Sequence, residues 1–388
     1  MDSRQMLFAL LRMQICGAEV KQDIQKALSR QMLEEVYSLA KKHDLAHIAG
    51  QALSDLGCLG DDEISLELKK QAMLAVYRHT RMEHDLKLAC DTLEKAEIPY
   101  MPLKGAVIRK YYPEAWMRTS CDIDILVKQE FLESAQKRLE QQGFCYQAKT
   151  SHDISMRSPG NVHLELHFDL TEDAVYAVPA AQMAVLRDVW EWELPCPESK
   201  WVRQMPDEMF YFYHISHMAK HFENGGCGIK PFLDLWILHH RVEHEREKRE
   251  ALLEKGGLLI FAKAVEKLSR VWFSGEEADE QTRQLEQYIL DGGVYGTSKN
   301  SMAVKQAQTG GKIRYLLNKI WLPYNIIKYY YPVLQTHKWL MPVYQVRRWF
   351  RIAFCGDLDG AVQTIKANAG MDEETVCSVR QLLNQLGL

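Results

Sequence analysis

A strictly alternating segment at residues 162–170 is the feature that most constrains the fold of this chain. It reads Val-His-Leu-Glu-Leu-His-Phe-Asp-Leu. Successive side chains of a β-strand point to opposite faces of the sheet, so one face of this segment is entirely apolar. The other face carries His163, Glu165, His167 and Asp169. The pattern predicts a strand with one buried and one polar face.

Three further strands are predicted nearby, at residues 100–103, 123–127 and 144–147, with a helix at 129–142 between the last two. Strands interleaved with helices indicate an α+β fold in which a small mixed sheet is flanked by helical regions. We expect four regions: a helical N-terminal region (1–97), the sheet-containing core (98–172), a helical region (173–290) and a basic, aromatic helical C-terminal region (291–388).

The composition is that of a globular protein. The 388 residues are 47% apolar and carry a formal charge of −4, which excludes a disordered chain. Nine cysteines are widely spaced without a C-x-x-C pair, which predicts reduced thiols. The N-terminus lacks a convincing signal-peptide cleavage site, and no window reaches the ~18 apolar residues of a membrane span. These features favour a cytoplasmic protein with no integral membrane segment.

Two carboxylates begin the second predicted strand, Asp122-Ile-Asp-Ile-Leu-Val. Asp122 and Asp124 are two apart and project from the same face, while Ile123 and Ile125 point into the core. Two adjacent carboxylates repel each other unless they share a cation, and Mg²⁺ bound by carboxylates and substrate phosphates meets that need. The alternative is a solvated strand end, which D-x-D alone does not exclude.

A third carboxylate lies in the alternating strand. Glu165 sits between apolar neighbours, where an acid is costly unless it is paired or metal-bound. If strands 123–127 and 162–170 are neighbours, Glu165 joins Asp122 and Asp124 in a three-carboxylate cluster. The alternative is an antiparallel strand with one solvated face, which has the same alternation.

A glycine-containing turn precedes these strands. Leu103-Lys104-Gly105-Ala106 follows a predicted strand and begins a helical stretch, so its backbone N–H groups are expected at a helix N-terminus, where phosphate binds favourably. Gly105 permits close approach of a ligand, and Lys104 supplies a positive charge. Arg118 is a further candidate for phosphate oxygens, because its planar guanidinium can engage two of them.

These motifs in this order resemble the nucleotidyltransferase superfamily of the DNA polymerase beta type. More closely, Leu-Lys-Gly, Asp-Ile-Asp-Ile-Leu-Val and Leu-Glu-Leu-His resemble a bacterial family of uncharacterised nucleotidyltransferases. The resemblance covers residues 99–170 and extends loosely to the helical flanks. The usual turn is Gly-Gly or Gly-Ser, whereas here Ala106 follows Gly105, which leaves Lys104 as the candidate to compensate.

The resemblance implies transfer of a nucleoside monophosphate from a nucleoside triphosphate to an acceptor hydroxyl, with release of pyrophosphate. It implies Mg²⁺, with Mn²⁺ as the alternative, bound by Asp122, Asp124 and Glu165. Lys104, Gly105 and Arg118 are the expected phosphate-binding residues. His167 shares a strand face with Glu165 and is expected beside the metal ligands. The base, the acceptor and the oligomeric state are not specified; a small hydroxylated molecule, a protein and a tRNA all remain candidate acceptors.

Three histidines follow at helical spacing. His214, His217 and His221 form one stripe of a predicted helix, with Asp234 on the next. The stripe is a candidate polar lining of the nucleotide or acceptor cleft, which we favour over a zinc site. Ordinary core or surface histidines are the interpretation favoured over both.

Residues 292–356 contain ten of the 48 Lys and Arg residues and none of the 52 Asp and Glu residues, together with twelve aromatic residues. The small net charge is therefore a cancellation between an acidic body and a basic segment. The segment suits an RNA such as tRNA, or a membrane surface or anionic lipid-linked sugar. In the third interpretation, the one favoured here, its aromatics are core, its lysines are solvated, and Pro323, Pro332 and Pro342 separate short helices.

Two other functions compete. A D-x-D glycosyltransferase binding a nucleotide-sugar requires a nucleotide-binding βαβ unit before the D-x-D, whereas residues 1–97 have a helical pattern. A non-catalytic nucleotide-binding protein of the same fold would be expected to lack a carboxylate, and all three are present.

Overall fold

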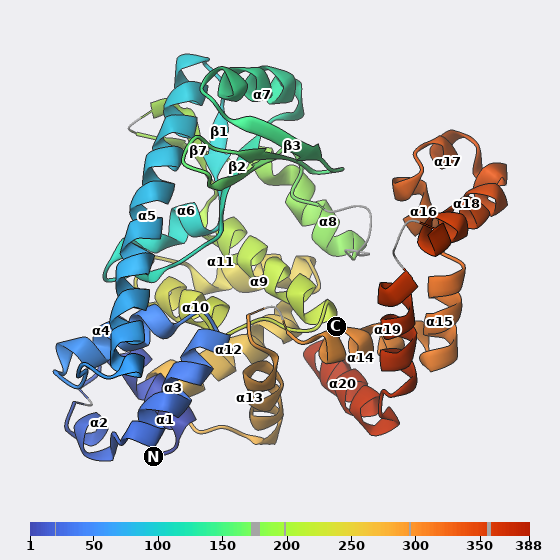
Figure 1. The fold of residues 1–388 in the computed structure, drawn as a ribbon. Coiled ribbons are helices and arrows are strands. Elements are labelled where there is room, and N and C mark those ends of the chain that lie inside the picture. Colours follow the sequence, from blue (N-terminus) through green and yellow to red (C-terminus); the bar gives the residue numbers. More distant parts are fainter. Residues whose placement is uncertain (20, 172–178, 198, 295, 355–357) are drawn as a thin grey trace.

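The computed structural model describes residues 1–388 except 20, 172–178, 198, 295 and 355–357. The protein is α+β, as predicted, with a seven-stranded mixed sheet and helical regions towards both termini (Figure 1). Within the described ranges, no helix combines the length and the apolar character needed to cross a membrane. The eight described cysteines are free, as predicted, and Cys355 lies outside the described residues.

A block of helices precedes the sheet, and its last member is much the longest. The Asp62 carboxylate accepts a hydrogen bond from the Ser65 amide and caps this helix, α5. Met82, Ala89 and Leu93 lie on one stripe of α5 and pack against the sheet. The bounds in this region are α1 Ser3–Leu11, a π-helical turn Arg12–Cys16, α2 Lys21–Ala27, α3 Arg30–Lys42, α4 Ala46–Asp55 and α5 Glu63–Lys95.

The sheet has the strand order β3-β4-β5-β2-β1-β7-β6. β2 pairs in parallel with β5, β1 pairs in parallel with β7, and the remaining neighbours are antiparallel. The bounds are β1 Tyr100–Pro102, β2 Asp122–Val127, β3 Cys145–Lys149, β4 Asp153–Arg157, β5 His163–His167, β6 Leu194–Cys196 and β7 Ser199–Gln204.

Three of these strands were not predicted from the sequence. β4 has only two buried apolar residues, Ile154 and Met156, so its alternation is too short to stand out. β6 contains Pro195, which favours an edge position, and the residues of β7 are exposed or half-buried. β7 extends the sheet into the range 173–290, which was expected to be helical, by pairing with β1.

The two faces of the central strands have different environments. Ile123, Ile125 and Leu164 pack in one apolar core with residues of α5 and α7. The opposite face, which carries Asp124 and Glu165, forms part of a pocket wall together with residues of α9 and α10. The helices around and after the sheet are α6 Gly105–Ile108, α7 Leu132–Gln141, α8 Ala180–Arg187, α9 Asp207–Glu223, α10 Lys230–His240, α11 Arg246–Lys255, α12 Leu259–Ser274 and α13 Glu280–Gly292.

The C-terminal helices form a separate small core and an outlying lobe (Figure 1). We call residues 312–354 the basic lobe. Pro323 and Pro332 precede helices there, as predicted, but the expectation that the aromatics are core is wrong for Trp339 and Phe350, which are exposed. The bounds are α14 Ser298–Thr309, α15 Lys312–Ile320, α16 Tyr324–Tyr330, α17 Val333–Thr336, α18 Met341–Phe354, α19 Leu358–Ala369 and α20 Glu373–Leu386.

Candidate functional site

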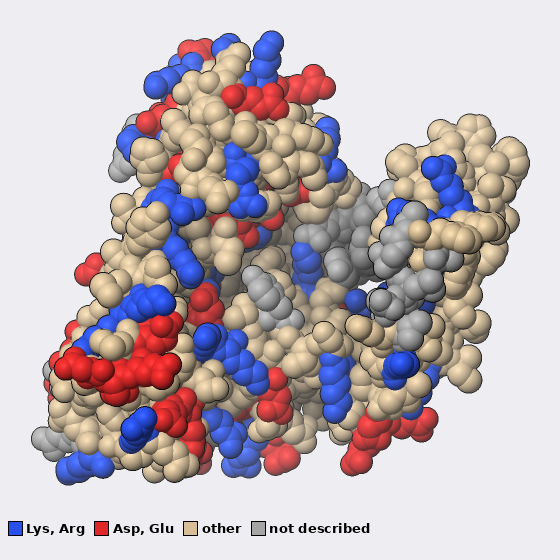
Figure 2. All heavy atoms as spheres, viewed as in Figure 1, with Lys and Arg blue, Asp and Glu red and all other residues tan. Residues whose placement is uncertain are grey.

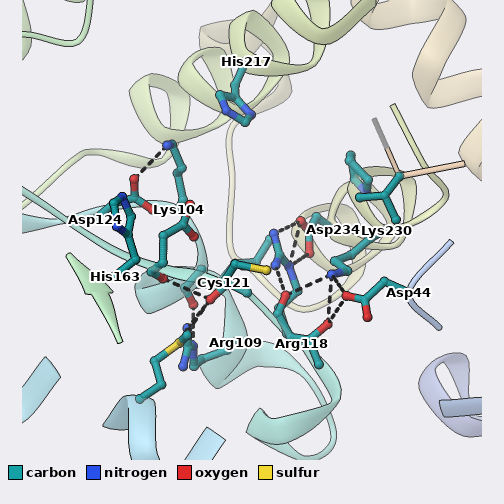
Figure 3. Close-up of a pocket in the computed structure, with 18 of the residues that line it drawn as sticks. Asp44, Lys104, Arg109, Arg118, Cys121, Asp124, His163, His217, Lys230 and Asp234 are labelled. Atoms are coloured by element: carbon teal, nitrogen blue, oxygen red, sulfur yellow. Dashed lines mark hydrogen bonds and ion pairs between the residues drawn. The ribbon is translucent and has the colours of Figure 1, made fainter. Parts of the chain in front are cut away.

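A pocket of about 770 Å³ lies between the polar face of the sheet and helices α5, α9 and α10 (Figure 3). Its size is that of an ordinary small-molecule site. Nine of the ten candidate site residues line it: Lys104, Gly105, Arg118, Asp122, Asp124, Glu165, His214, His217 and His221. His167 lines a smaller adjoining cavity of about 50 Å³ that shares Lys104 and His217 with the first.

The pairing of β2 with β5 brings the predicted carboxylates together. In the parallel register, Asp124 lies directly opposite Glu165 and Asp122 opposite His163. The ligand atoms of Asp124, Glu165 and His167 all lie within 4.8 Å of one another. Among the described residues, no other three His, Cys, Asp or Glu side chains bring their ligand atoms together in this way, and Asp122 lines the same pocket beside them.

The site holds its own compensating charges. The Lys104 ammonium donates a 2.8 Å hydrogen bond to Asp124 Oδ1 (Figure 3). Nε2 of His167 lies 3.0 Å from the same oxygen and 3.3 Å from Oε2 of Glu165. Burial opposes a charge on His167, but its contacts with the two carboxylates raise its pKa to about 9. A cation of the protein therefore already stabilises each carboxylate.

The two acids of the D-x-D strand are not equivalent. Burial opposes ionisation of Asp124, yet the Lys104 ammonium and the His167 contact lower its pKa. Burial and the neighbouring Asp124 charge instead raise the pKa of Asp122. The charge of Asp124 is thus balanced by Lys104 and His167, whereas Asp122 favours binding a proton or a cation.

The glycine turn is tight. Lys104 has φ +44°, an uncommon value for a residue with a side chain, and this turn directs its ammonium towards Asp124. A Cβ at Gly105 would lie 3.1 Å from Ser120 Oγ and 3.3 Å from Arg109 Nη2. The predicted helix after the turn is short, with only four α-helical residues in α6.

Arg118 is held by a buried acid. Its Nε and Nη2 donate to both carboxylate oxygens of Asp234 at 2.8–3.0 Å, and Tyr112 donates to the same carboxylate at 2.7 Å. Asp234 is completely buried. The guanidinium that the sequence suggested for phosphate is therefore directed towards α10, at the pocket wall (Figure 3).

A second polar cluster was missed from the sequence. Lys230 donates to Asp44 Oδ2 at 2.6 Å and to the Thr119 hydroxyl at 2.9 Å, and Thr119 donates to the same Asp44 oxygen. Asp44 lies between α3 and α4 with φ +55°. The only local sign of this cluster in the sequence is Asp44 itself, a residue type that tolerates positive φ in a turn. Its partners could not be identified, because they lie far along the chain.

The histidine stripe of α9 lines the pocket. His217 projects from α9 towards it, and burial lowers its pKa well below the usual range, as does the nearby Lys104 charge. Nε2 of His214 lies 3.2 Å from the Pro231 carbonyl oxygen, and burial lowers its pKa. His214 and His217 thus present imidazoles that are neutral at pH 7 to the pocket, and the stripe is separate from the Asp124, Glu165 and His167 group.

The sequence profile of a family described as "Uncharacterised nucleotidyltransferase" matches residues 29–273. Among the curated proteins and among the solved structures, none matches the chain. The matched range covers more than half of the sequence and includes every strand of the sheet and the pocket-lining helices α5, α9 and α10. The chain belongs to this family of uncharacterised nucleotidyltransferases.

Proposed function

We propose that this protein transfers a nucleoside monophosphate from a nucleoside triphosphate to an acceptor hydroxyl, with release of pyrophosphate. The observation that carries the proposal is the direct opposition of Asp124 and Glu165 on adjacent parallel strands, with His167 beside them and Lys104 at the pocket wall. Such a cluster in a pocket of ligand size suits charge-dominated phosphoryl chemistry.

The donor set fits a hard divalent cation. Asp124 and Glu165 supply oxygen ligands, and Asp122 lies on the same strand face. His167 lies within the same 4.8 Å, but its raised pKa makes it a hydrogen-bond donor to these acids and not a ligand. Mg²⁺ bound here, or Mn²⁺, would polarise the phosphate oxygens and stabilise the charge that develops on them. We assign Asp122, Asp124 and Glu165 as its ligands, with His167 holding two of them in place.

The remaining roles follow from charge and position. Lys104 and the Gly105 amide bind the β and γ phosphates, while Arg118, whose charge is balanced by Asp234, forms part of the adjoining wall. Glu165, at 26% exposed the more accessible of the two opposed acids, accepts the proton of the acceptor hydroxyl. The catalytic unit comprises the core at 98–172 and the region at 173–290, which adds β6 and β7 to the sheet together with the pocket helices α9 and α10.

The test measures transfer and binding separately. Purified protein is incubated with Mg²⁺ and each of the four triphosphates labelled at the α-phosphate, with pools of small hydroxylated molecules, proteins and tRNA as acceptors. We expect label in one acceptor pool together with an equal amount of pyrophosphate. The acceptor class then follows from the pool that becomes labelled.

Asp124→Asn keeps the shape of the side chain and removes its charge, so transfer should fall by about 10³-fold or more. Glu133→Gln, an exposed change on α7, is the matched control and should transfer normally. Triphosphate binding without pyrophosphate release in any pool would favour the non-catalytic alternative. Unchanged transfer by Asp124→Asn would overturn the site assignment.

The region before the sheet disfavours the glycosyltransferase alternative. It requires a nucleotide-binding βαβ unit before the D-x-D, and the described residues before β1 form helices only. Incubation with nucleotide-sugars under the same conditions should therefore give no sugar transfer.

A further inference from the structure

The basic lobe presents apolar side chains to solvent in regular stripes. Ile313, Leu317 and Ile320 follow one another along α15 at spacings of four and three residues, and all are exposed. Such spacing places them on one face of the helix. Ile313 is 77% exposed, a value typical of a surface residue and not of a core isoleucine.

α18 has the same design. Its exposed apolar residues follow at spacings of three and four: Val343, Val346, Phe350 and Phe354. Phe354 is 79% exposed, and Trp339, just before the helix, is 74% exposed. An apolar stripe along each of two helices is more than the scattered apolar residues of a normal surface, and it indicates a binding surface.

The lobe is folded although these residues face outward. Tyr315, Ile327 and Leu334 are buried within it. The side chain of Gln345 is also buried, and it donates to the Leu322 carbonyl at 2.6 Å. The exposed stripes are therefore not the missing core of an unfolded lobe, because other residues of the lobe already form its interior.

The charge of the lobe has one sign. Residues 312–354 contain eight Lys and Arg residues and no Asp or Glu. In Figure 2 this part of the molecule shows blue and tan atoms, and red atoms gather only below it. Charge complementarity requires an anionic partner. A second copy of the same face is disfavoured, because it would bring cations against cations.

We propose that α15–α18 bind the surface of an anionic lipid membrane. Interfacial helices insert an apolar face among acyl chains, hold Trp at the headgroup level and direct Lys and Arg to lipid phosphates. All three kinds of residue are present in the lobe. RNA could use the cations and the aromatics, but it offers nothing to bury the aliphatic residues Ile313, Leu317, Val343 and Val346.

The proposal is independent of nucleotidyl transfer. The lobe lies outside the range that matches the family, 29–273, and its residues do not line the pocket. It predicts a peripheral association.

The test uses the whole protein and flotation with lipid vesicles. Vesicles of phosphatidylcholine with phosphatidylglycerol should bind it about tenfold or more tightly than phosphatidylcholine alone, and high salt should weaken the binding. Tryptophan fluorescence should be quenched by brominated acyl chains, which requires insertion beyond simple electrostatic attraction. Trp339→Phe should reduce that quenching.

Two paired substitutions separate the apolar and the charged contributions. Phe350→Ser with Phe354→Ser removes exposed apolar area, and Arg347→Glu with Arg351→Glu reverses exposed charge. Each should weaken vesicle binding about tenfold or more, and neither removes a buried side chain of the lobe. Circular dichroism and a thermal melt check that both variants fold.

Matched controls lie on the opposite part of the molecule. Met73→Ser on α5 changes an exposed apolar residue, and Lys137→Glu with Arg138→Glu on α7 changes exposed charge; both should bind as the unmodified protein does. Equal binding with and without the anionic lipid, or full binding by both lobe variants, overturns the proposal. If the protein binds bulk tRNA but not vesicles, or forms dimers but does not bind vesicles, the proposal is also overturned.

Discussion

Replacing Asp234 by Ala should cost this protein a large part of its stability, although the residue lies far along the chain from the D-x-D strand. The carboxylate is completely buried and accepts three hydrogen bonds of 2.8–3.0 Å from Arg118 and one of 2.7 Å from Tyr112. Removing it leaves the Arg118 guanidinium, itself only 14% exposed, without its counter-charge. Breaking a buried ion pair in this way costs about 3–5 kcal/mol.

The assay is urea unfolding followed by tryptophan fluorescence. With a slope of about 3 kcal/mol per molar, at the upper end of the usual range because the chain has 388 residues, a loss of about 4 kcal/mol lowers the midpoint by about 1.3 M. Replacing both partners, Asp234→Leu with Arg118→Met, should recover most of the loss, because no buried charge is left unpaired. Glu250→Ala, which breaks the exposed pair with Arg246, is the control and should cost less than about 1 kcal/mol. A loss below about 1 kcal/mol for Asp234→Ala would refute the reasoning.

Three other outcomes follow from the same structure. Gly256→Ala would place a Cβ 2.2 Å from the buried ring of Phe212, so a thermal melt should show a loss of about 1–3 kcal/mol. Burial lowers the pKa values of His43 and His47 to about 4. The unfolded chain therefore binds more protons than the folded chain below pH 6.5. Between pH 7 and 5 each of these histidines should lower the free energy of unfolding by about 2 kcal/mol, which urea unfolding measures. The total loss should be smaller in His47→Gln. Mn²⁺ should raise the melting temperature of the unmodified protein but not that of Asp124→Asn.

The local geometry of the site could be predicted from sequence because it depends on strand periodicity. Alternation placed Asp122 with Asp124 and Glu165 with His167 before any pairing was known, and the parallel register of β2 with β5 then set Asp124 opposite Glu165. The same periodicity predicts which face of each strand is apolar. Short strands such as β4 and β6 could not be predicted from alternation, because they have too few alternating residues.

Contacts between distant segments could not be predicted in this way. Arg118 pairs with Asp234, from which it is separated by 116 positions in the sequence, and Lys230 pairs with Asp44 across 186 positions. These pairs depend on how α10 packs against the sheet and the N-terminal helices, which hydrophobic spacing does not encode. In the basic lobe, spacing does reveal the stripe at Val343 and Phe350, but the same stripe would result from packing against the protein's own core.

The asymmetry between the two acids of the D-x-D strand leads to a last prediction. Lys104 and His167 both contact Asp124, so Asp124→Asn removes the counter-charge of one half-buried and one buried cation and should cost about 3 kcal/mol. Asp122 is disfavoured as an anion by burial and by Asp124, so Asp122→Asn should leave stability unchanged within about 0.5 kcal/mol or raise it. Both substitutions should nevertheless abolish nucleotidyl transfer if both acids act on the substrate complex. Urea midpoints and transfer rates of the two variants measure this separation of stability from activity, and an equal loss of stability in both would contradict it.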